Sequence, residues 1–139
     1  MHTKIFSATT LGIQAYLVDV EVDISYGMIN FFIVGLPDAS IKESRQRIQS
    51  ALKNSGINLP ERKIIVNLAP AHLKKEGTLF DLPIAIGILQ AAGYIQMSAE
   101  FLHETVIIGE LSLTGTIQPV QGILPITYDT SCHQKKRLS

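Results

Sequence analysis

KIIVNLAPAHLKKEGTLFDLPIAIGILQAA, residues 63–92, is the stretch of sequence that decides the fold. Its first part, residues 63–68, is a short and nearly continuous apolar run rich in β-branched residues, which predicts a buried strand. The part that follows, residues 69–77, is polar and interrupted by proline and glycine, so it predicts an exposed loop. The stretch therefore begins as strand followed by loop.

The same stretch ends in a predicted helix. Asp81 is expected to be its N-cap, with Pro83 in the first turn, where the missing proline N–H costs nothing. Residues 84–92 are apolar on nearly every side, which is typical of a buried helix, and Gly93 follows as a plausible end. Strand, loop and helix together indicate a sheet with helices packed against it.

Upstream of this unit the sequence favours β structure. Residues 4–10 and 13–25 are rich in β-branched and aromatic residues, and residues 26–30 are expected to form a turn into a short strand at 31–34. Apolar residues alternate with acidic ones in the second segment, which predicts a half-buried strand with one wet, acidic face; the apolar set is Val18, Val20, Val22 and Ile24. We expect these strands to form an antiparallel meander.

A helix is expected between the meander and residue 63. Ser40 and Glu43 form a capping-box pattern, while Asp38 is a rival N-cap, and Gly56 suits the position after the last turn. The apolar residues of the segment fall on one helical face; they are Ile41, Ile48, Ala51 and Leu52.

Two further strands, at residues 105–108 and 113–120, complete the prediction. The order β-β-β-α-β-α-β-β predicts an α+β or split α/β fold with the helices on one face of the sheet. A chain of 139 residues with 46% hydrophobic and 17% charged residues is enough for one domain with a real core.

Charge and cysteine content exclude several functions. Twelve basic and twelve acidic side chains cancel, so any DNA affinity must come from a local patch or from multivalency in a larger assembly. Cys132 is the only cysteine, which excludes an intramolecular disulfide, and the four histidines lack metal-ligand spacing, so we expect no metal site.

The N-terminus does not have the layout of a signal peptide, and no apolar run is long enough to span a membrane. We therefore expect a cytoplasmic protein without membrane contact.

Several ordered motifs carry a family resemblance. They include Val34-Gly35-Leu36-Pro37-Asp38, IQSALKNSG at residues 48–56, Val66-Asn67-Leu68-Ala69-Pro70, and Lys75-Glu76-Gly77 followed by Phe80-Asp81-Leu82-Pro83. On these motifs the chain resembles the N-terminal domain of the magnesium-chelatase-like, ComM-type (YifB-type) competence ATPases. It is more distantly similar to the Lon-like domain of the RadA-type repair ATPases and to the Lon protease domain.

The resemblance implies a Lon-type domain over residues 1–126. After Ile126 the sequence leaves the family pattern, and residues 127–139 form a polar, basic tail without apolar periodicity. We therefore expect the last strand and helix of the fold to be missing, as in a truncated gene product. The uncovered sheet edge is expected to drive self-association, and the tail is expected to be mobile unless such a contact orders it.

In Lon-type proteases a serine and a lysine form the catalytic dyad. Matching Gly77 to the family glycine places Leu79 at the serine position, and the motif at the end of the chain places Leu124 at the lysine position. Leucine has neither a nucleophile nor a titratable amine, so the resemblance implies a domain without protease activity. Thr78 is the only candidate substitute nucleophile beside the dyad position.

Two sets of basic residues are candidates for DNA or partner contact. Lys74 and Lys75 lie in the loop expected to be exposed before the second helix, whose N-terminus could add a preference for anions. Lys42 and Arg45 make the outer side of the first helix basic. The alternative for both sets is structural: a loop specific to the fold in one case, and an ordinary solvated helix face in the other.

The resemblance implies a non-catalytic accessory domain of a AAA+ ATPase of DNA uptake and recombination, which serves assembly and DNA or partner contact. The expected partners are the ATPase module and a second copy of the chain, and DNA is a further candidate. No phosphate-binding Gly-Lys-Ser/Thr motif occurs, so ATP and Mg²⁺ would belong to the ATPase module. The alternatives are an autonomous DNA-binding module and a residual peptidase that uses Thr78.

Overall fold

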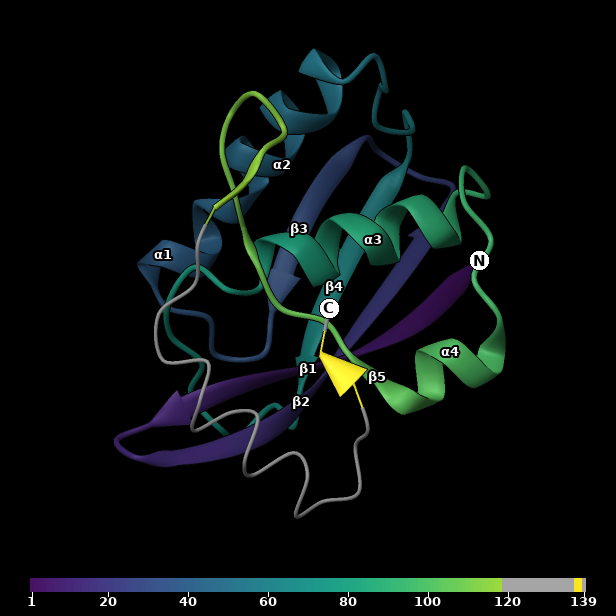
Figure 1. Ribbon diagram of the computed structural model, residues 1–139. Coiled ribbons are helices and arrows are strands. Elements are labelled where there is room, and N and C mark those ends of the chain that lie inside the picture. The colour runs from purple at the N-terminus through teal and green to yellow at the C-terminus, as the bar shows by residue number, and fades with distance from the viewer. Residues whose placement is uncertain (119–136, 139) are drawn as a thin grey trace.

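A long antiparallel hairpin forms the centre of the sheet in the computed structural model, which describes residues 1–118 and 137–138 (Figure 1). Strand β1 (His2–Leu11) pairs with β2 (Gln14–Ser25) along its whole length, and Leu11 lies opposite Gln14. Gly12, in the two-residue loop, has a φ of +64°, the positive value that such a tight loop favours at its first position.

The predicted alternation in the second strand is confirmed. The apolar residues of β2 from Val18 to Ile24 are at most 3% exposed and belong to the core. The acidic residues between them therefore lie on the opposite face of the sheet, where Asp23 is exposed and Asp19 is 3.8 Å from the Lys4 ammonium group. The sheet thus has one apolar face and one wet face.

The third strand does not continue the meander, so that prediction is wrong. Strand β3 (Asn30–Val34) pairs in parallel with β4 (Lys63–Ala69), and β4 pairs antiparallel with β2. Strand β4 thereby separates β3 from β2. The helical segment between β3 and β4 provides the long crossover that a parallel pair requires.

That crossover contains two consecutive helices, α1 (Ala39–Lys42) and α2 (Ser44–Asn54). Asp38, rather than Ser40, is the N-cap: its Oδ1 accepts a hydrogen bond of 2.9 Å from the Ile41 N–H, so the predicted capping box is wrong. Gly56 follows α2 with a φ of +83°, as expected for a residue that ends a helix.

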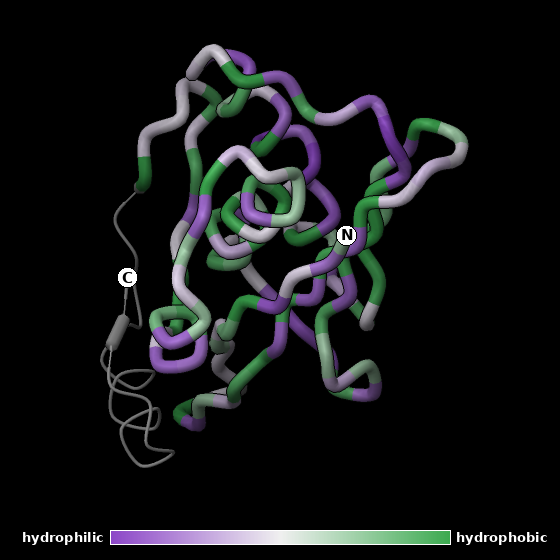
Figure 2. Tube along the Cα trace, turned by 90° about the vertical axis from the view of Figure 1, so that its right-hand side faces the viewer, coloured by the Kyte–Doolittle hydropathy of each residue, from purple (hydrophilic) through white to green (hydrophobic). Residues whose placement is uncertain are grey.

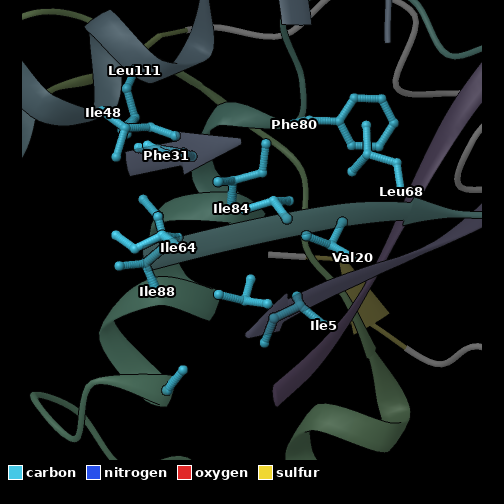
Figure 3. Close-up of a cluster of buried hydrophobic side chains, with 14 of the residues drawn as sticks. Ile5, Val20, Phe31, Ile48, Ile64, Leu68, Phe80, Ile84, Ile88 and Leu111 are labelled. Atoms are coloured by element: carbon cyan, nitrogen blue, oxygen red, sulfur yellow. The ribbon is translucent and has the colours of Figure 1, made fainter. Parts of the chain in front are cut away.

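Helix α3 (Asp81–Ala91) lies across the apolar face of the sheet (Figure 1). Its Ile84 and Ile88 are fully buried, and they meet side chains of β1, β2 and β4 in one core (Figure 3). The apolar face of the first helical segment, including Ile41 and Ile48, belongs to the same core. The expectation that helices pack on one face of the sheet holds for these three helices.

The part after α3 is more broken than expected. Helix α4 (Ala99–Glu104), capped by the Ser98 side chain, was not predicted, and the strand expected at 105–108 is reduced to β5 (Thr105–Val106). Within the strand expected at 113–120, the described residues 113–118 contain β7 (Ile117–Gln118), which pairs antiparallel with β6 (Glu110–Leu111), and residues 119 and 120 lie outside the described part. Because β5 and β6 have only two residues each, they leave little hydrophobic periodicity in the sequence.

The main sheet has the order β3-β4-β2-β1-β5-β8, with β5 parallel to both of its neighbours. Strand β8 (Arg137–Leu138) lies in the predicted polar tail, and the tail residues before it lie outside the described part of the chain. The architecture is a mixed α+β fold. Figure 2 shows hydrophobic and hydrophilic residues alternating along much of the chain. On the edge strand β3, the hydrophobic Phe32 and Val34 are 40% and 45% exposed.

Candidate functional site

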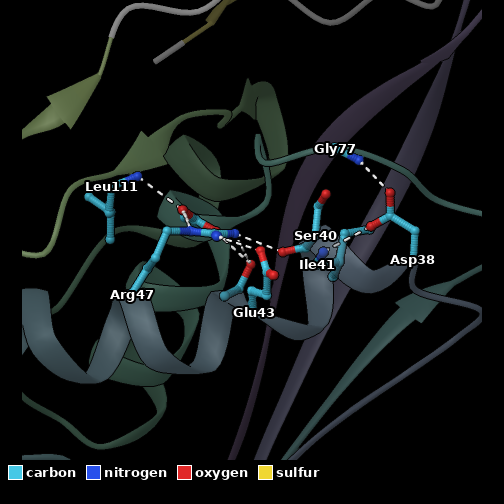
Figure 4. Close-up of polar contacts among 9 residues, drawn as sticks. Asp38, Ser40, Ile41, Glu43, Arg47, Gly77 and Leu111 are labelled. Carbon is cyan, nitrogen blue, oxygen red and sulfur yellow. Dashed lines mark hydrogen bonds and ion pairs between the residues drawn. The ribbon is translucent and has the colours of Figure 1, made fainter.

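The loop before α3 is fastened to the turn that precedes α1. The Lys75 N–H donates to the Leu36 carbonyl and the Asp38 N–H donates to the Lys75 carbonyl, both at 3.1 Å. The Asp38 carboxylate, which caps α1, also accepts a hydrogen bond of 3.1 Å from the Gly77 N–H (Figure 4). Asp38 therefore joins two of the motifs that carried the family resemblance.

Lys42 and Lys74 lie on the segments that Asp38 joins. Lys42 is exposed in the last turn of α1. The Lys74 side chain is 67% exposed, and its ammonium group is 3.9 Å from the Glu76 carboxylate. A surface ion pair of this length is weak and leaves the lysine available to other anions. Both residues are accessible, as a contact role requires.

Lys75 is not on the surface, so the expectation that it is exposed is wrong. The residue is 0% exposed, and its Nζ donates to the carbonyl oxygens of Gly35, at 2.8 Å, and of Pro70. Burial lowers the pKa of the Lys75 ammonium group from its ordinary value, because the charged form loses its hydration. Lys75 holds the loop to the turn from inside and cannot contact DNA from this position.

Gly35 explains why the turn can approach the sheet so closely. A Cβ at this position would lie 2.3 Å from the carbonyl oxygen of Leu68 in β4, and the φ of Gly35 is +102°. Both the space and the backbone conformation thus require glycine. The close approach puts the Gly35 carbonyl within reach of Lys75.

Arg45 differs from Lys42 and Lys74 in its burial and in its contacts. It is half-buried at the start of α2, and its guanidinium donates a hydrogen bond of 3.1 Å to the Phe31 carbonyl of the edge strand β3. It also lines a groove that neither lysine lines. The four predicted contact residues therefore divide into an exposed pair, a buried lysine and a groove arginine.

Leu79, at the position that the resemblance assigns to the nucleophile, is half-buried against apolar side chains. It packs against a small cluster on the wet side of the hairpin, formed by Ala8, Ala15, Val106 and Ile108. Its carbonyl accepts a hydrogen bond of 2.9 Å from the Gly109 N–H. Leu124, the second predicted dyad position, lies outside the described residues.

Sequence reasoning missed a buried charge network around Asp81 (Figure 4). Asp81 is 0% exposed and is the first residue of α3, not its N-cap. Its carboxylate accepts hydrogen bonds from the Ser44 hydroxyl at 2.5 Å, from Arg47 Nε at 2.6 Å and from the Leu111 N–H at 3.1 Å. A second nitrogen of the Arg47 guanidinium lies 3.0 Å from the carboxylate, so the ion pair is bidentate.

This network connects α2, α3 and the β6–β7 hairpin. The hydrogen bond with Asp81, more than any other influence, raises the pKa of Arg47 above its ordinary value. Since both oxygens of Asp81 accept from charged or backbone donors, the carboxylate is not free to act as a general base. The sequence contains one signal of this network: Asp81 stands between the apolar residues Phe80 and Leu82, which is an unusual position for a helix-capping aspartate exposed to solvent.

Metal and membrane sites find no support in the described part of the chain. There, no group of three or more His, Cys, Asp or Glu side chains could hold a metal ion. Likewise, no helix within residues 1–118 and 137–138 is long and apolar enough to cross a membrane.

Comparison with known proteins identifies the family. A family model described as subunit ChlI of Mg-chelatase matches residues 20–138. The chain is 46% identical over 121 residues to Competence protein ComM of Haemophilus influenzae, covering 87% of this chain and 23% of ComM. It is 45% identical over 124 residues to the uncharacterized protein YifB of Escherichia coli, covering 89% of this chain and 23% of YifB.

A more distant relative gives the same coverage. The uncharacterized protein Rv2897c of Mycobacterium tuberculosis is 38% identical over 122 residues, which are 88% of this chain and 24% of Rv2897c. The chain thus spans about a quarter of the length of these relatives. It belongs to the magnesium-chelatase-like family of ComM and YifB.

Proposed function

We propose that the chain is a non-catalytic accessory domain of a ComM-type AAA+ ATPase that acts in DNA uptake and recombination. The observation that carries this proposal is the 46% identity to ComM over 87% of the chain but only 23% of ComM. The matched part corresponds to one α+β unit, so the ATPase activity, with its ATP and Mg²⁺, is assigned to the rest of such a protein. A DNA-processing role would place it in the cytoplasm.

The fold we assign to this unit is the Lon type. The long β1–β2 hairpin, the parallel β3–β4 pair and the connection from β4 through the Lys75 loop to α3 support this assignment. In this fold a residue of the turn that precedes α3 would be the nucleophile, and Leu79 holds that position in the alignment of motifs. Leu79 instead contributes its side chain to an apolar cluster, which supports a structural role for the position.

A chimaera tests the accessory role. In H. influenzae ComM, the region aligned with this chain would be deleted or replaced by it. We expect deletion to abolish natural transformation and replacement to restore a large part of it. A chimaera that is as inactive as the deletion, although it accumulates to the same level, would refute a shared role.

The exposed pair Lys42 and Lys74 is the proposed DNA or partner contact. A double reversal to Glu should impair transformation by the chimaera, whereas the nearby Glu76→Gln should not. Direct binding separates the two kinds of partner: DNA affinity should fall steeply with salt concentration if the lysines contact phosphates. Loss of transformation without any DNA binding at low salt would assign the surface to a protein partner.

A residual peptidase that uses Thr78 is the enzymatic alternative. Thr78 is half-buried beside Leu79. Casein and fluorogenic peptides would be incubated with the protein and with Thr78→Ala. We expect no cleavage by either protein, and cleavage that is lost in Thr78→Ala would overturn the non-catalytic assignment.

We also propose that the chain self-associates. The support for this lies at the β3 edge, where Phe32, Val34 and Leu36 are 40%, 45% and 53% exposed. Sedimentation at micromolar concentration should show a species larger than the monomer, and Val34→Lys should shift it toward the monomer. A monomeric wild-type chain would refute this proposal.

A further inference from the structure

A groove of about 400 Å³ opens at the β3 edge of the sheet, beside α2. It is lined by the beginning of β3, by one side of α2 and by the segment at residues 59–62 that leads into β4. Lys42 and Lys74 are not among its lining residues. The groove is therefore a second surface, distinct from the exposed lysine pair.

Two arginines give the groove a positive character. Arg45 uses one guanidinium nitrogen on the Phe31 carbonyl, which leaves other N–H groups for a ligand. Arg62 holds its guanidinium 4.3 Å from the centre of the Tyr26 ring. Stacking of this kind orients the plane but leaves the N–H groups at its edge free to bind a carboxylate. Glu61 is the only acidic residue among those that line the groove.

Besides the arginines, the groove is lined by buried apolar side chains at its base and by two glutamine side chains on α2. Phe31 and Ile64, which are 5% and 2% exposed, lie at its base. Gln46 and Gln49 are exposed, three residues apart on α2, so their side chains lie on the same side of the helix. A glutamine amide can both donate and accept, which matches the alternating N–H and C=O groups of an extended main chain.

We propose that this groove binds an extended, acidic segment of a partner protein. Carboxylates of the segment pair with Arg45 and Arg62, and its main chain bonds to Gln46 and Gln49. Single-stranded nucleic acid also carries anions, but it binds by stacking bases on open aromatic rings. Among the described residues that line the groove, Phe31 is the only aromatic one, and it is 5% exposed. The exposed Tyr26 ring does not line the groove, and one of its faces is taken by the Arg62 guanidinium, so the observations favour a peptide.

This inference adds a second contact surface to the accessory role proposed above, and it rests on that role. The two can fail separately, because the role is tested by transformation with the chimaera and the groove is tested by binding to the isolated chain. The probe is a fluorescein-labelled octapeptide of alternating Asp and Val, which places all carboxylates on one side when extended. Its binding is measured by fluorescence anisotropy.

Matched variants locate the binding site. Gln49→Glu adds a carboxylate to the groove without removing an arginine, and Lys53→Gln removes a charge elsewhere on α2, where Lys53 is exposed and does not line the groove. Each changes the net charge by the same amount. We expect Gln49→Glu and Arg62→Gln to weaken binding by about tenfold, and Lys53→Gln by less than about twofold. Far-UV circular dichroism would verify that all variants are folded.

Four results would overturn the proposal. The first is no binding of the Asp-Val peptide up to about 1 mM. The second is an equal loss in Gln49→Glu and Lys53→Gln, which would mean nonspecific attraction. The third is equal binding of an Asn-Val peptide, which would exclude recognition of carboxylates. The fourth is stronger binding of an oligothymidylate of eight nucleotides that is weakened by Gln49→Glu, which would assign the groove to nucleic acid.

Discussion

Replacing Asp81 by Asn tests whether the buried ion pair holds the domain together. Asparagine keeps the shape of the side chain but removes its charge, so Arg47 loses a bidentate partner at 2.6 and 3.0 Å. The Arg47 side chain is only 19% exposed and Asp81 is fully buried, so water replaces little of the lost interaction. Removing one partner of such a pair typically costs about 3–5 kcal/mol. We expect the lower end, about 3 kcal/mol, because Arg47 keeps some contact with water.

Urea denaturation followed by far-UV circular dichroism measures this cost, since the chain has no tryptophan. With a urea dependence of about 2 kcal/mol per molar, a loss of about 3 kcal/mol lowers the midpoint by about 1.5 M. Glu43→Gln is the matched control. It removes the other carboxylate near Arg47, which lies 3.5 Å away and is 68% exposed. A surface pair of this kind contributes at most about 0.5 kcal/mol.

A double-mutant cycle with Arg47→Met identifies the origin of the loss. Arg47→Met alone leaves Asp81 buried with donors only from Ser44 and Leu111, so we expect a loss of about 3–5 kcal/mol. The double variant should cost clearly less than the sum, because no unpaired charge remains. Strict additivity, or an Asp81→Asn variant within about 0.5 kcal/mol of the wild type, would refute the reasoning.

Further predictions concern the loop and the turn. Burial lowers the folded-state pKa of Lys75, so between that value and 10.5 the unfolded chain binds more protons than the folded chain. The free energy of unfolding of the wild type, relative to that of Lys75→Met, should therefore rise with pH in this window, as measured by urea denaturation at a series of pH values. Gly35→Ala should lose at least about 2 kcal/mol in urea denaturation, from the positive φ and the contact with the Leu68 carbonyl. Gly56→Ala, which has a φ of +83° but nothing within 4 Å of the added Cβ, should lose only about 1 kcal/mol.

The predictions that rested on hydrophobic periodicity were the accurate ones. The alternation in β2, the buried strand at β4 and the buried helix α3 all depend on how apolar residues repeat along a few turns or pleats, and the structure has all three. The family followed from motifs of the same local kind. The strands of two residues were predicted poorly: β5 is shorter than the strand expected at 105–108, and β6 was not expected, because such short elements carry too few residues for a period.

The contact candidates were predicted less well, because their roles depend on residues far away in sequence. Lys74 and Lys75 are neighbours of the same type, yet one is 67% exposed in its side chain and the other is fully buried. The difference arises because the carbonyl of Gly35, 40 residues away, lies within 2.8 Å of the Lys75 ammonium group. Composition and local pattern cannot distinguish the two lysines.

The sequence by itself determined the character of the segments: which strands have an apolar side and which helix is buried. Only the tertiary structure decided how the segments are connected. It inserted β4 between β2 and β3, turned Asp81 from an expected cap into the partner of Arg47, and placed Arg45 at a groove that Lys42 does not line. The physical reason is the distance along the sequence between the residues that determine each feature. Burial on one face repeats every two or about four residues, whereas strand order and buried ion pairs depend on groups that meet only when the whole chain has folded.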